Sequence, residues 1–342
     1  MNERQKAETI RNGLIQRIES AIDTGFEALA LDVFQYQSRY NPLYRHFLQL
    51  LGASPLAVTR VADIPFLPIQ FFKSHHIRSG YWDPALAFSS SGTTAAATSR
   101  HFLRDPEFYR RNARRGFTRF YGPVEDYCIL ALLPSYLERS GSSLVFMAED
   151  FIRQSRYPRS GFFLYNIEEL VGILADCKKN AVPTLLLGVS FALWELAEQY
   201  PMDLGGITIM ETGGMKGRRR ELTREELHGI LKSAFQVEAV HSEYGMTELL
   251  SQAYSRGGGI FYPSSTMRVL TREISDPLSP EKPGKTGALN IVDLANLDTI
   301  SFIAADDLGR VYADGHFEIL GRLDASDARG CNLLIADVEG NG

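Results

Sequence analysis

The chain has 342 residues, of which 44% are hydrophobic and 23% charged, and its formal net charge is -5. This is an ordinary globular composition, and the chain is long enough to bury a sizeable core in one large domain or two unequal ones. A net negative charge leaves no basic stripe for a phosphate backbone, which argues against a nucleic-acid partner. No run of about 18 apolar residues is present, which argues against a membrane span.

Two further features point to a cytoplasmic protein. The first residues, MNERQKAETIRNG, lack the apolar core of a signal peptide. The three cysteines are too few for a disulfide framework and fit a reducing compartment. None forms a Cys-x-x-Cys pair, so we expect no structural zinc site. Cys128 falls in an apolar run and Cys177 in a helical pattern, and we expect both to be structural.

The N-terminal part of the chain predicts helices followed by an irregular segment. In residues 4–52, apolar residues recur at near-helical spacing, and Asn41-Pro42 divides the region into two pieces. Residues 64–77, IPFLPIQFFKSHHI, contain two prolines and predict a loop that leads into a short strand.

From there the pattern alternates between strands and helices. Short apolar runs predict buried strands, and amphipathic or charged stretches predict helices at 191–200 and 218–235; the strands are expected at 126–135, 182–190, 206–213 and 237–245. Such alternation predicts an α/β fold with a largely parallel sheet. After about residue 265, shorter alternating runs predict a smaller, mostly antiparallel β subdomain.

A loop rich in hydroxyl side chains lies between the segment 64–77 and the first strand predicted at 126–135. Residues 88–94 read FSSSGTT, with hydroxyls on nearly every residue around Gly92. Backbone N–H groups freed by a glycine, together with short hydroxyl side chains, can wrap an anionic phosphate. It is not a Walker loop, because no Gly-Lys-Ser/Thr follows. Taken alone, the motif also fits a solvated Ser/Thr turn.

Four later motifs carry carboxylates and a cation, two of them at the ends of predicted strands. EYGMTE ends at Glu248, and a carboxylate there can hold Mg²⁺, which favours oxygen ligands and nucleotide phosphates. ETGGMK begins at Glu211 and ends another strand, where ligands bind in open α/β sheets. ADDLGR offers a carboxylate for ribose hydroxyls, and GRLD offers Arg322 for a phosphate or ribose. Singly, each also fits a surface turn.

In this order the motifs resemble those of the adenylate-forming superfamily, which contains acyl-CoA ligases, luciferases and adenylation domains. The resemblance covers residues 88–324 and implies ATP and Mg²⁺ as cofactors. The residues that it implicates are Ser90, Ser91, Gly92, Thr93 and Thr94 at the pyrophosphate, Gly213 and Gly214 at the adenine, Tyr244 and Gly245 against the adenylate, Thr247 and Glu248 at the α-phosphate and Mg²⁺, and Asp307 and Arg322 at the ribose.

A narrower resemblance covers nearly the whole chain. IPFLPIQFFKSH, FSSSGTT, LLPSYLERSGSSLVFM, EYGMTELLSQAYS and GRLDASDARGCNLL are similar to segments of the LuxE-type acyl-protein synthetases, a component of bacterial fatty-acid reductase complexes. The resemblance implies that a fatty acid, activated with ATP, is held as a thioester on Cys331 and passed to an acyl reductase. A small buried hydrophobe is the alternative role for Cys331.

The same resemblance sets the expected domain organisation. We expect an adenylation domain at 1–320 and a truncated hinge with a C-terminal arm at 321–342, without the mobile C-terminal domain of acyl-CoA ligases. Ala95 departs from the glycine usual after SSGTT, and Lys216 is the nearest substitute for that domain's catalytic lysine. Two other functions stay open: a ligase that transfers the acyl group to coenzyme A or a carrier protein, and a non-catalytic subunit of a reductase complex.

Overall fold

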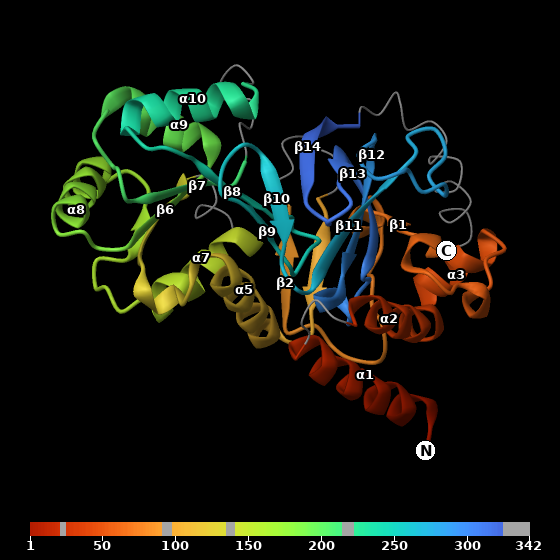
Figure 1. Ribbon diagram of the computed structural model, residues 1–342. Helices are drawn as coiled ribbons and strands as arrows, with labels where there is room; N and C mark the ends of the chain where they lie inside the picture. Colours follow the sequence, from red (N-terminus) through yellow and green to blue (C-terminus); the bar gives the residue numbers. More distant parts are fainter. Residues whose placement is uncertain (21–24, 91–97, 135–140, 214–221, 324–342) are drawn as a thin grey trace.

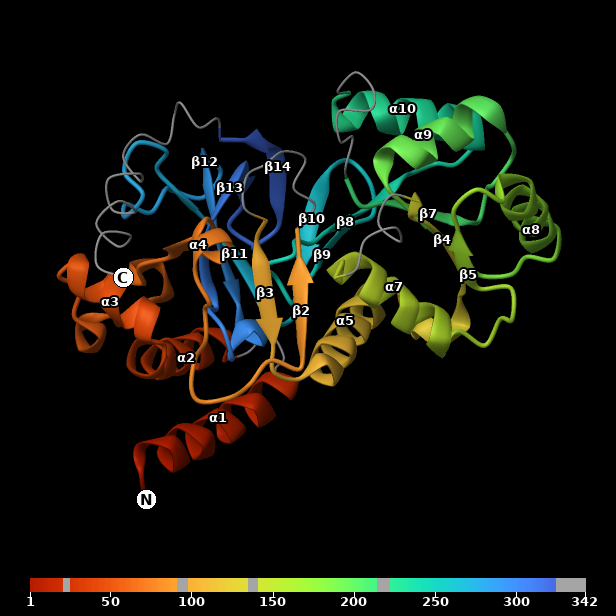
Figure 2. The same cartoon turned by 180° about the vertical axis from the view of Figure 1, so that it is seen from behind.

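One mixed β-sheet runs through the structure, which is a computed structural model that describes residues 1–20, 25–90, 98–134, 141–213 and 222–323. Within these ranges twelve strands are hydrogen-bonded into one sheet, in the order β11-β12-β13-β14-β10-β9-β8-β7-β6-β4-β5, with β1 paired to β13. The predicted α/β fold is confirmed. Figures 1 and 2 show the sheet from opposite sides, with helices packed around it.

The first half of the sheet is parallel. Its strands are β4 (Cys128–Leu132), β5 (Gly161–Phe163), β6 (Thr184–Gly188), β7 (Thr208–Glu211) and β8 (His241–Tyr244). Every residue of β4 and β6 is buried, as expected of strands covered on both faces. The covering helices are α7 (Ser143–Gln154), α8 (Ile167–Lys179), α9 (Ser190–Gln199) and α10 (Arg224–Phe235), of which α8, α9 and α10 form the green lobe of Figure 1.

The second half of the sheet is antiparallel. Its strands are β9 (Ala253–Ser255), β10 (Ile260–Pro263), β11 (Met267–Arg272), β12 (Thr286–Asp293), β13 (Phe302–Val311) and β14 (Phe317–Arg322), joined in parallel by β1 (Leu67–Pro68) on β13. The predicted antiparallel strands after residue 265 are confirmed. They continue the same sheet, because β14 pairs with β10 and β9 pairs with β8.

Three N-terminal helices pack against the antiparallel half (Figures 1 and 2). They are α1 (Glu3–Glu19), α2 (Phe26–Tyr40) and α3 (Pro42–Leu50). The predicted break at Asn41-Pro42 is confirmed: the Asn41 side chain accepts a 3.0 Å hydrogen bond from the Tyr44 N–H and so caps α3. The break between α1 and α2 was not predicted; α2 starts after Gly25, whose φ is +88°.

The remaining elements refine the predictions. The segment 64–77 contains β1, as predicted, and then the helical turn α4 (Phe71–Ser74), which was not. The hairpin of β2 (Leu86–Ser89) and β3 (Arg100–Leu103) and the helix α5 (Pro106–Tyr121) were missed. Short 3-10 turns occur at Pro55–Ala57, Val61–Asp63, Val124–Asp126 and Leu294–Asn296.

Several smaller predictions can also be compared with the structure. The helix predicted over 218–235 begins at Arg224, because the Thr223 and Glu226 side chains form a capping box; residues 214–221 lie outside the described ranges. Cys128 and Cys177 are free and buried, which confirms their structural role. Among the helices that the structure describes, none is long and apolar enough to cross a membrane.

One buried amide ties the helices to the sheet near its antiparallel strands. The Gln37 side chain of α2 is fully buried, and its Nε2 donates hydrogen bonds of 3.0 Å to the carbonyls of Asn296 and Leu297. Its Oε1 accepts a 3.0 Å hydrogen bond from the Ser301 N–H. The turn between β12 and β13 is therefore fixed by a side chain more than 250 residues away in the sequence.

Replacing Gln37 with leucine is expected to lower the free energy of unfolding by about 2–4 kcal/mol, because buried carbonyls and an N–H lose their partners. Chemical denaturation of Gln37→Leu and of the exposed control Gln49→Leu checks this. A Gln37→Leu variant as stable as the control would contradict the role assigned to this amide.

Candidate functional site

A hydrogen-bonded triad joins three of the motifs. The Tyr244 hydroxyl donates a 2.8 Å hydrogen bond to Asp307 Oδ2, and Arg322 Nε lies 3.3 Å from Asp307 Oδ1. Tyr244 and Asp307 are buried, whereas the Arg322 side chain is 78% exposed. Burial, and then the nearby Asp307 carboxylate, raise the pKa of Tyr244 well above its ordinary value. Two lone-pair positions of the Asp307 carboxylate stay available for ligand hydroxyls.

Strand geometry explains how these residues meet. Asp307 and Arg322 are directly paired partners of β13 and β14, so their side chains lie on the same face. Tyr244 ends β8, and its ring packs edge-on against Phe261 and Phe317 at centroid distances of 6.0 and 5.6 Å. These two aromatic rings hold the hydroxyl of Tyr244 toward Asp307.

The loop after β8 is fixed by groups from distant elements. His101 Nδ1 lies 2.9 Å from the Thr247 carbonyl, and Asn296 Nδ2 donates a 2.8 Å bond to the Glu248 carbonyl. Burial lowers the pKa of His101 to about 4, so the ring is neutral at neutral pH. Its Nδ1 must then donate to the carbonyl, while Nε2 accepts from the Thr299 hydroxyl at 3.1 Å.

Asp293 supports the next part of this loop. Its carboxylate accepts hydrogen bonds from the N–H groups of Leu250 and Ser251 at 2.7 and 3.0 Å and from the Ser251 hydroxyl at 2.5 Å. Burial raises the pKa of Asp293 to about 6, although these bonds favour the charged form. The backbone that carries Thr247 and Glu248 is thus held from both sides.

Glu248 is the carboxylate for which the sequence predicts a role at a nucleotide-bound cation. Its side chain is buried, and burial raises its pKa, while a hydrogen bond with Ser99 and the charges of Arg322 and Lys73 act in the opposite sense. No cluster of three His, Cys, Asp or Glu residues able to hold a metal exists in the described part of the chain. A single carboxylate still fits Mg²⁺, which is commonly bound by one or two carboxylates and substrate phosphates.

The end of β7 carries a second buried carboxylate, Glu211. Its Oε2 accepts hydrogen bonds from the Gly213 N–H at 2.6 Å and the Ser190 hydroxyl at 3.2 Å. Burial alone would raise its pKa, but contacts with His228, Arg224 and Ser242 and the hydrogen bond from the Gly213 N–H lower it to about 2. Glu211 therefore shapes the turn at Gly213, where φ is +72°.

Ser90 lies at the base of the predicted phosphate loop. Its N–H donates to the Ser99 carbonyl at 3.1 Å, and its hydroxyl accepts from the Ser99 N–H at 3.0 Å. Ser99 is the residue that bonds Glu248, so the loop base and EYGMTE are neighbours. The rest of the proposed set, Ser91, Gly92, Thr93, Thr94, Gly214, Lys216 and Cys331, lies outside the described residues.

Glu243, directly before Tyr244, is a buried carboxyl that the sequence did not single out. Burial, and then repulsion by Glu211, raise its pKa to about 8. The proton is therefore retained at neutral pH, and the group can donate as well as accept a hydrogen bond.

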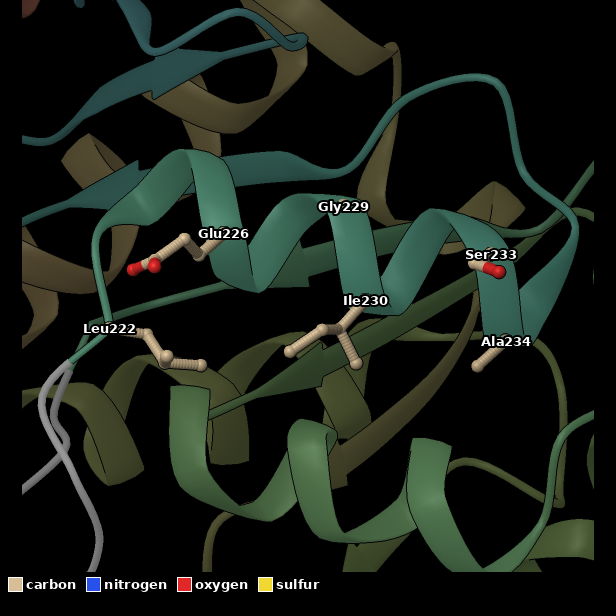
Figure 3. Close-up of a pocket in the computed structure, with 6 residues that line it drawn as sticks. All are labelled: Leu222, Glu226, Gly229, Ile230, Ser233 and Ala234. Atoms are coloured by element: carbon tan, nitrogen blue, oxygen red, sulfur yellow. The ribbon is translucent and has the colours of Figure 1, made fainter.

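An open hollow of about 690 Å³ lies over one face of α10 (Figure 3). It is lined by Leu222, Glu226, Gly229, Ile230, Ser233 and Ala234. None of the predicted site residues that the structure describes lines this hollow.

The structure thus brings Tyr244, Asp307 and Arg322 into direct contact and links Ser90 to Glu248 through Ser99. The Arg322 charge also acts on Glu248. Residues that sequence analysis missed are Ser99, His101, Asp293 and Asn296, which hold the site in place. Nothing in their local sequence pattern marks them, because each bonds a residue of the site that lies well away along the chain.

Comparison with solved structures gives the same fold for several acyl-CoA ligases. ATP-bound MatB from Rhodopseudomonas palustris matches with a TM-score of 0.53 and 16% identity, over 71% of this chain and 49% of MatB. A 2-hydroxyisobutyryl-CoA ligase in complex with 2-HIB-AMP and CoA matches with a TM-score of 0.64 and 16% identity, over 95% and 70%. The long-chain-fatty-acid-CoA ligase FadD1 from Archaeoglobus fulgidus matches with a TM-score of 0.51 and 15% identity, over 75% and 54%.

These identities show a shared fold alone, and the chain spans about half the length of MatB. No protein-family model and no curated protein matches the chain.

The buried Glu243 carboxyl predicts a pH-dependent stability difference. Its pKa of about 8 in the folded state lies above the ordinary value near 4.5, so its stabilising proton is fully bound below pH 4.5 and is lost as the pH rises through 8. The free energy of unfolding of the wild type is therefore about 3 kcal/mol lower at pH 7 than below pH 4.5 because of this group. Glu243→Gln, which carries no titrating proton, should gain stability relative to the wild type between pH 5 and pH 8.

Denaturation curves at these two pH values, with the exposed Glu195→Gln as a control, measure the difference. Identical pH profiles for Glu243→Gln and the wild type would contradict the assignment.

Proposed function

We propose that the chain activates a carboxylic acid with ATP as an acyl-adenylate. The observation that carries the proposal is the triad of Tyr244, Asp307 and Arg322, with the buried Glu248 four residues further along the same loop. Three motifs that lie far apart along the chain meet there. The fold likeness to solved ligases, one with bound ATP and one with 2-HIB-AMP and CoA, supports the proposal.

The proposed roles of the site residues are those that the sequence motifs suggest. Asp307 binds the ribose hydroxyls, the Tyr244 ring lies against the adenosine, and Arg322 contacts a phosphate or the ribose. Ser90 to Thr94 wrap the pyrophosphate, and Gly213 and Gly214 border the adenine. Thr247 and Glu248 serve the α-phosphate, and Glu248 holds Mg²⁺, which would offset negative charge on the phosphates.

The proposed reaction has two steps. A carboxylate oxygen of the acid attacks the α-phosphorus, the bond to the bridging oxygen breaks, and pyrophosphate leaves. A thiolate then attacks the acyl carbon, the C–S bond forms, the C–O bond to AMP breaks, and the thiol proton passes to solvent. We propose Cys331 as the thiol, a fatty acid as the substrate class and an acyl reductase as the later acceptor, on the sequence resemblance alone.

Transfer to coenzyme A is the second candidate, since the neighbouring structures are those of acyl-CoA ligases. In that case Cys331 is inert, and a diffusible thiol attacks the adenylate. Both candidates share the first step and differ only in the acceptor.

Exchange of labelled pyrophosphate into ATP, dependent on an added carboxylic acid and on Mg²⁺, tests the first step. Asp307→Asn is expected to raise KM for ATP about tenfold or more, because one ligand-accepting oxygen is lost. Exposed Asp83→Asn is the matched control. Absence of exchange with every acid tested would refute acid activation.

Intact-protein mass spectrometry after incubation with MgATP and mixed carboxylic acids tests the second step. The wild type and the control Cys177→Ser should gain one acyl group that hydroxylamine removes, and Cys331→Ser should gain none. ATP consumption without an adduct on any of the three proteins would favour coenzyme A as the acceptor.

A further inference from the structure

A cluster of buried polar side chains lies behind the proposed nucleotide site. Glu243 of β8 and Tyr254 of β9 are directly paired, so their side chains share one face of the sheet. Tyr244, the next residue along β8, points to the opposite face, where it meets Asp307. We name Glu243, Gln252, Tyr254 and Ser264 the polar cluster.

Three atoms of the polar cluster have no hydrogen-bond partner. Gln252 Oε1, the Tyr254 hydroxyl and Ser264 Oγ are buried and unpaired within the described structure. Their residues are 3%, 1% and 4% exposed, and an unpaired polar atom in such a place costs stability. Three orphaned groups in one region indicate that something other than the described residues satisfies them.

Two glycines show that these groups are close together. A Cβ placed on Gly245 would lie 2.4 Å from Glu243 Oε1 and 3.7 Å from Gln252 Cγ. A Cβ placed on Gly116 of α5 would lie 3.9 Å from Gln252 Oε1 and 4.0 Å from Ser264 Oγ. Glu243, Gln252 and Ser264 therefore line one continuous region between the loop after β8 and α5.

The walls of this region are largely aromatic. The Tyr254 ring packs against Phe117, Phe120 and Tyr121 at centroid distances of 6.2, 5.4 and 5.6 Å. A few polar groups set in aromatic walls are typical of a small-molecule site in which the polar groups fix orientation.

The cluster borders the motif loop at Gly245. Gly245 is exposed, and the buried Glu243 carboxyl packs against its backbone, since a Cβ there would lie 2.4 Å from Glu243 Oε1. Glu243 and Tyr244 point to opposite faces of the sheet, and the proposed adenosine lies on the face of Tyr244. A ligand that crosses Gly245 would have its adenylate end on one side and its acyl end at the polar cluster.

The chemistry of the cluster favours a hydrogen-bond donor on the ligand. Gln252 Oε1 only accepts, and the Tyr254 and Ser264 hydroxyls can each accept as well as donate. The groups that act on Glu243 or are acted on by it are Tyr254 of β9, Tyr109 of α5 and the charged Glu211 of β7. Burial is the main cause of the raised pKa of both tyrosines, and the Glu243 charge raises it further. A protonated Glu243 carboxyl can form a hydrogen bond with either a donor or an acceptor on the ligand.

We propose that the polar cluster recognises a hydroxyl or amino group on the acyl part of the carboxylic acid, so that a plain hydrocarbon acid is a poor substrate. This inference rests on the proposed function and narrows its substrate class. A hydroxyl and an amine share the donor chemistry, and the experiment separates them.

The test compares matched acids in the acid-dependent pyrophosphate exchange assay with the purified full chain. The acids are hexanoate and hexanoates that carry one hydroxyl or one amino group at the second, third or last carbon. At least one substituted acid should exceed hexanoate about tenfold or more in kcat/KM, because a site built to bond a polar group rejects the analogue that lacks it. The same acid should raise the Tm of the protein more than hexanoate does.

Variants identify the residues responsible. Gln252→Leu and Glu243→Leu should each reduce the preference at least about tenfold, whereas Glu243→Gln, which keeps a donor and an acceptor, should retain it for a hydroxyl. If Glu243→Gln abolishes the preference for an amino-substituted hexanoate but keeps that for a hydroxylated one, the ligand group is an ammonium bound by the ionised Glu243 carboxylate. The exposed Glu195→Leu should leave the preference unchanged, and thermal melts confirm that each variant is folded.

The outcomes are distinct. Equal rates and Tm shifts for hexanoate and all its derivatives overturn the inference while the proposed function stands, with buried water satisfying the cluster. No exchange with any acid removes the proposed function and this inference together. A preference that survives Gln252→Leu and Glu243→Leu in folded protein also overturns it.

Discussion

The hydrogen bond from Tyr244 to Asp307 is the contact on which the site depends. Their strands are not neighbours: β9, β10 and β14 stand between β8 and β13 in the sheet. The 2.8 Å contact nevertheless joins the end of a parallel strand to the antiparallel half of the sheet. It brings motifs from opposite halves of the sheet together, and Arg322 joins them through its pairing with Asp307.

The same site is supported by buried polar groups, each of which needs partners. Gln37 holds the turn that contains Asn296, and Asn296 in turn bonds the Glu248 carbonyl. His101 and Asp293 fix the backbone on either side of Glu248. Because an unpaired buried group is costly, these bonds specify one loop position. The polar cluster around Glu243 departs from this pattern, since three of its atoms have no hydrogen-bond partner among the residues that the structure describes.

Much of the fold follows from local pattern, and the site only partly does. Apolar runs such as those of β4 and β6 gave buried strands, and Asn41-Pro42 gave the helix break, because burial and backbone geometry are local properties. The β2–β3 hairpin was missed because its strands are four residues long and flank a Ser-rich loop. Asp307 and Tyr244 were found from their motifs, whereas His101, Asp293 and Glu243 act through distant partners that no local pattern reveals.

The proposed nucleotide site is tested by a crystal structure of the protein with a non-hydrolysable acyl-sulfamoyl adenosine that carries a hydroxylated acyl chain. We expect the ribose hydroxyls on Asp307, the adenosine beside Tyr244, and the acyl hydroxyl bonded to Gln252 or Glu243. A ligand bound in the hollow over α10, or an adenosine that leaves the Tyr244–Asp307 pair untouched, would contradict it.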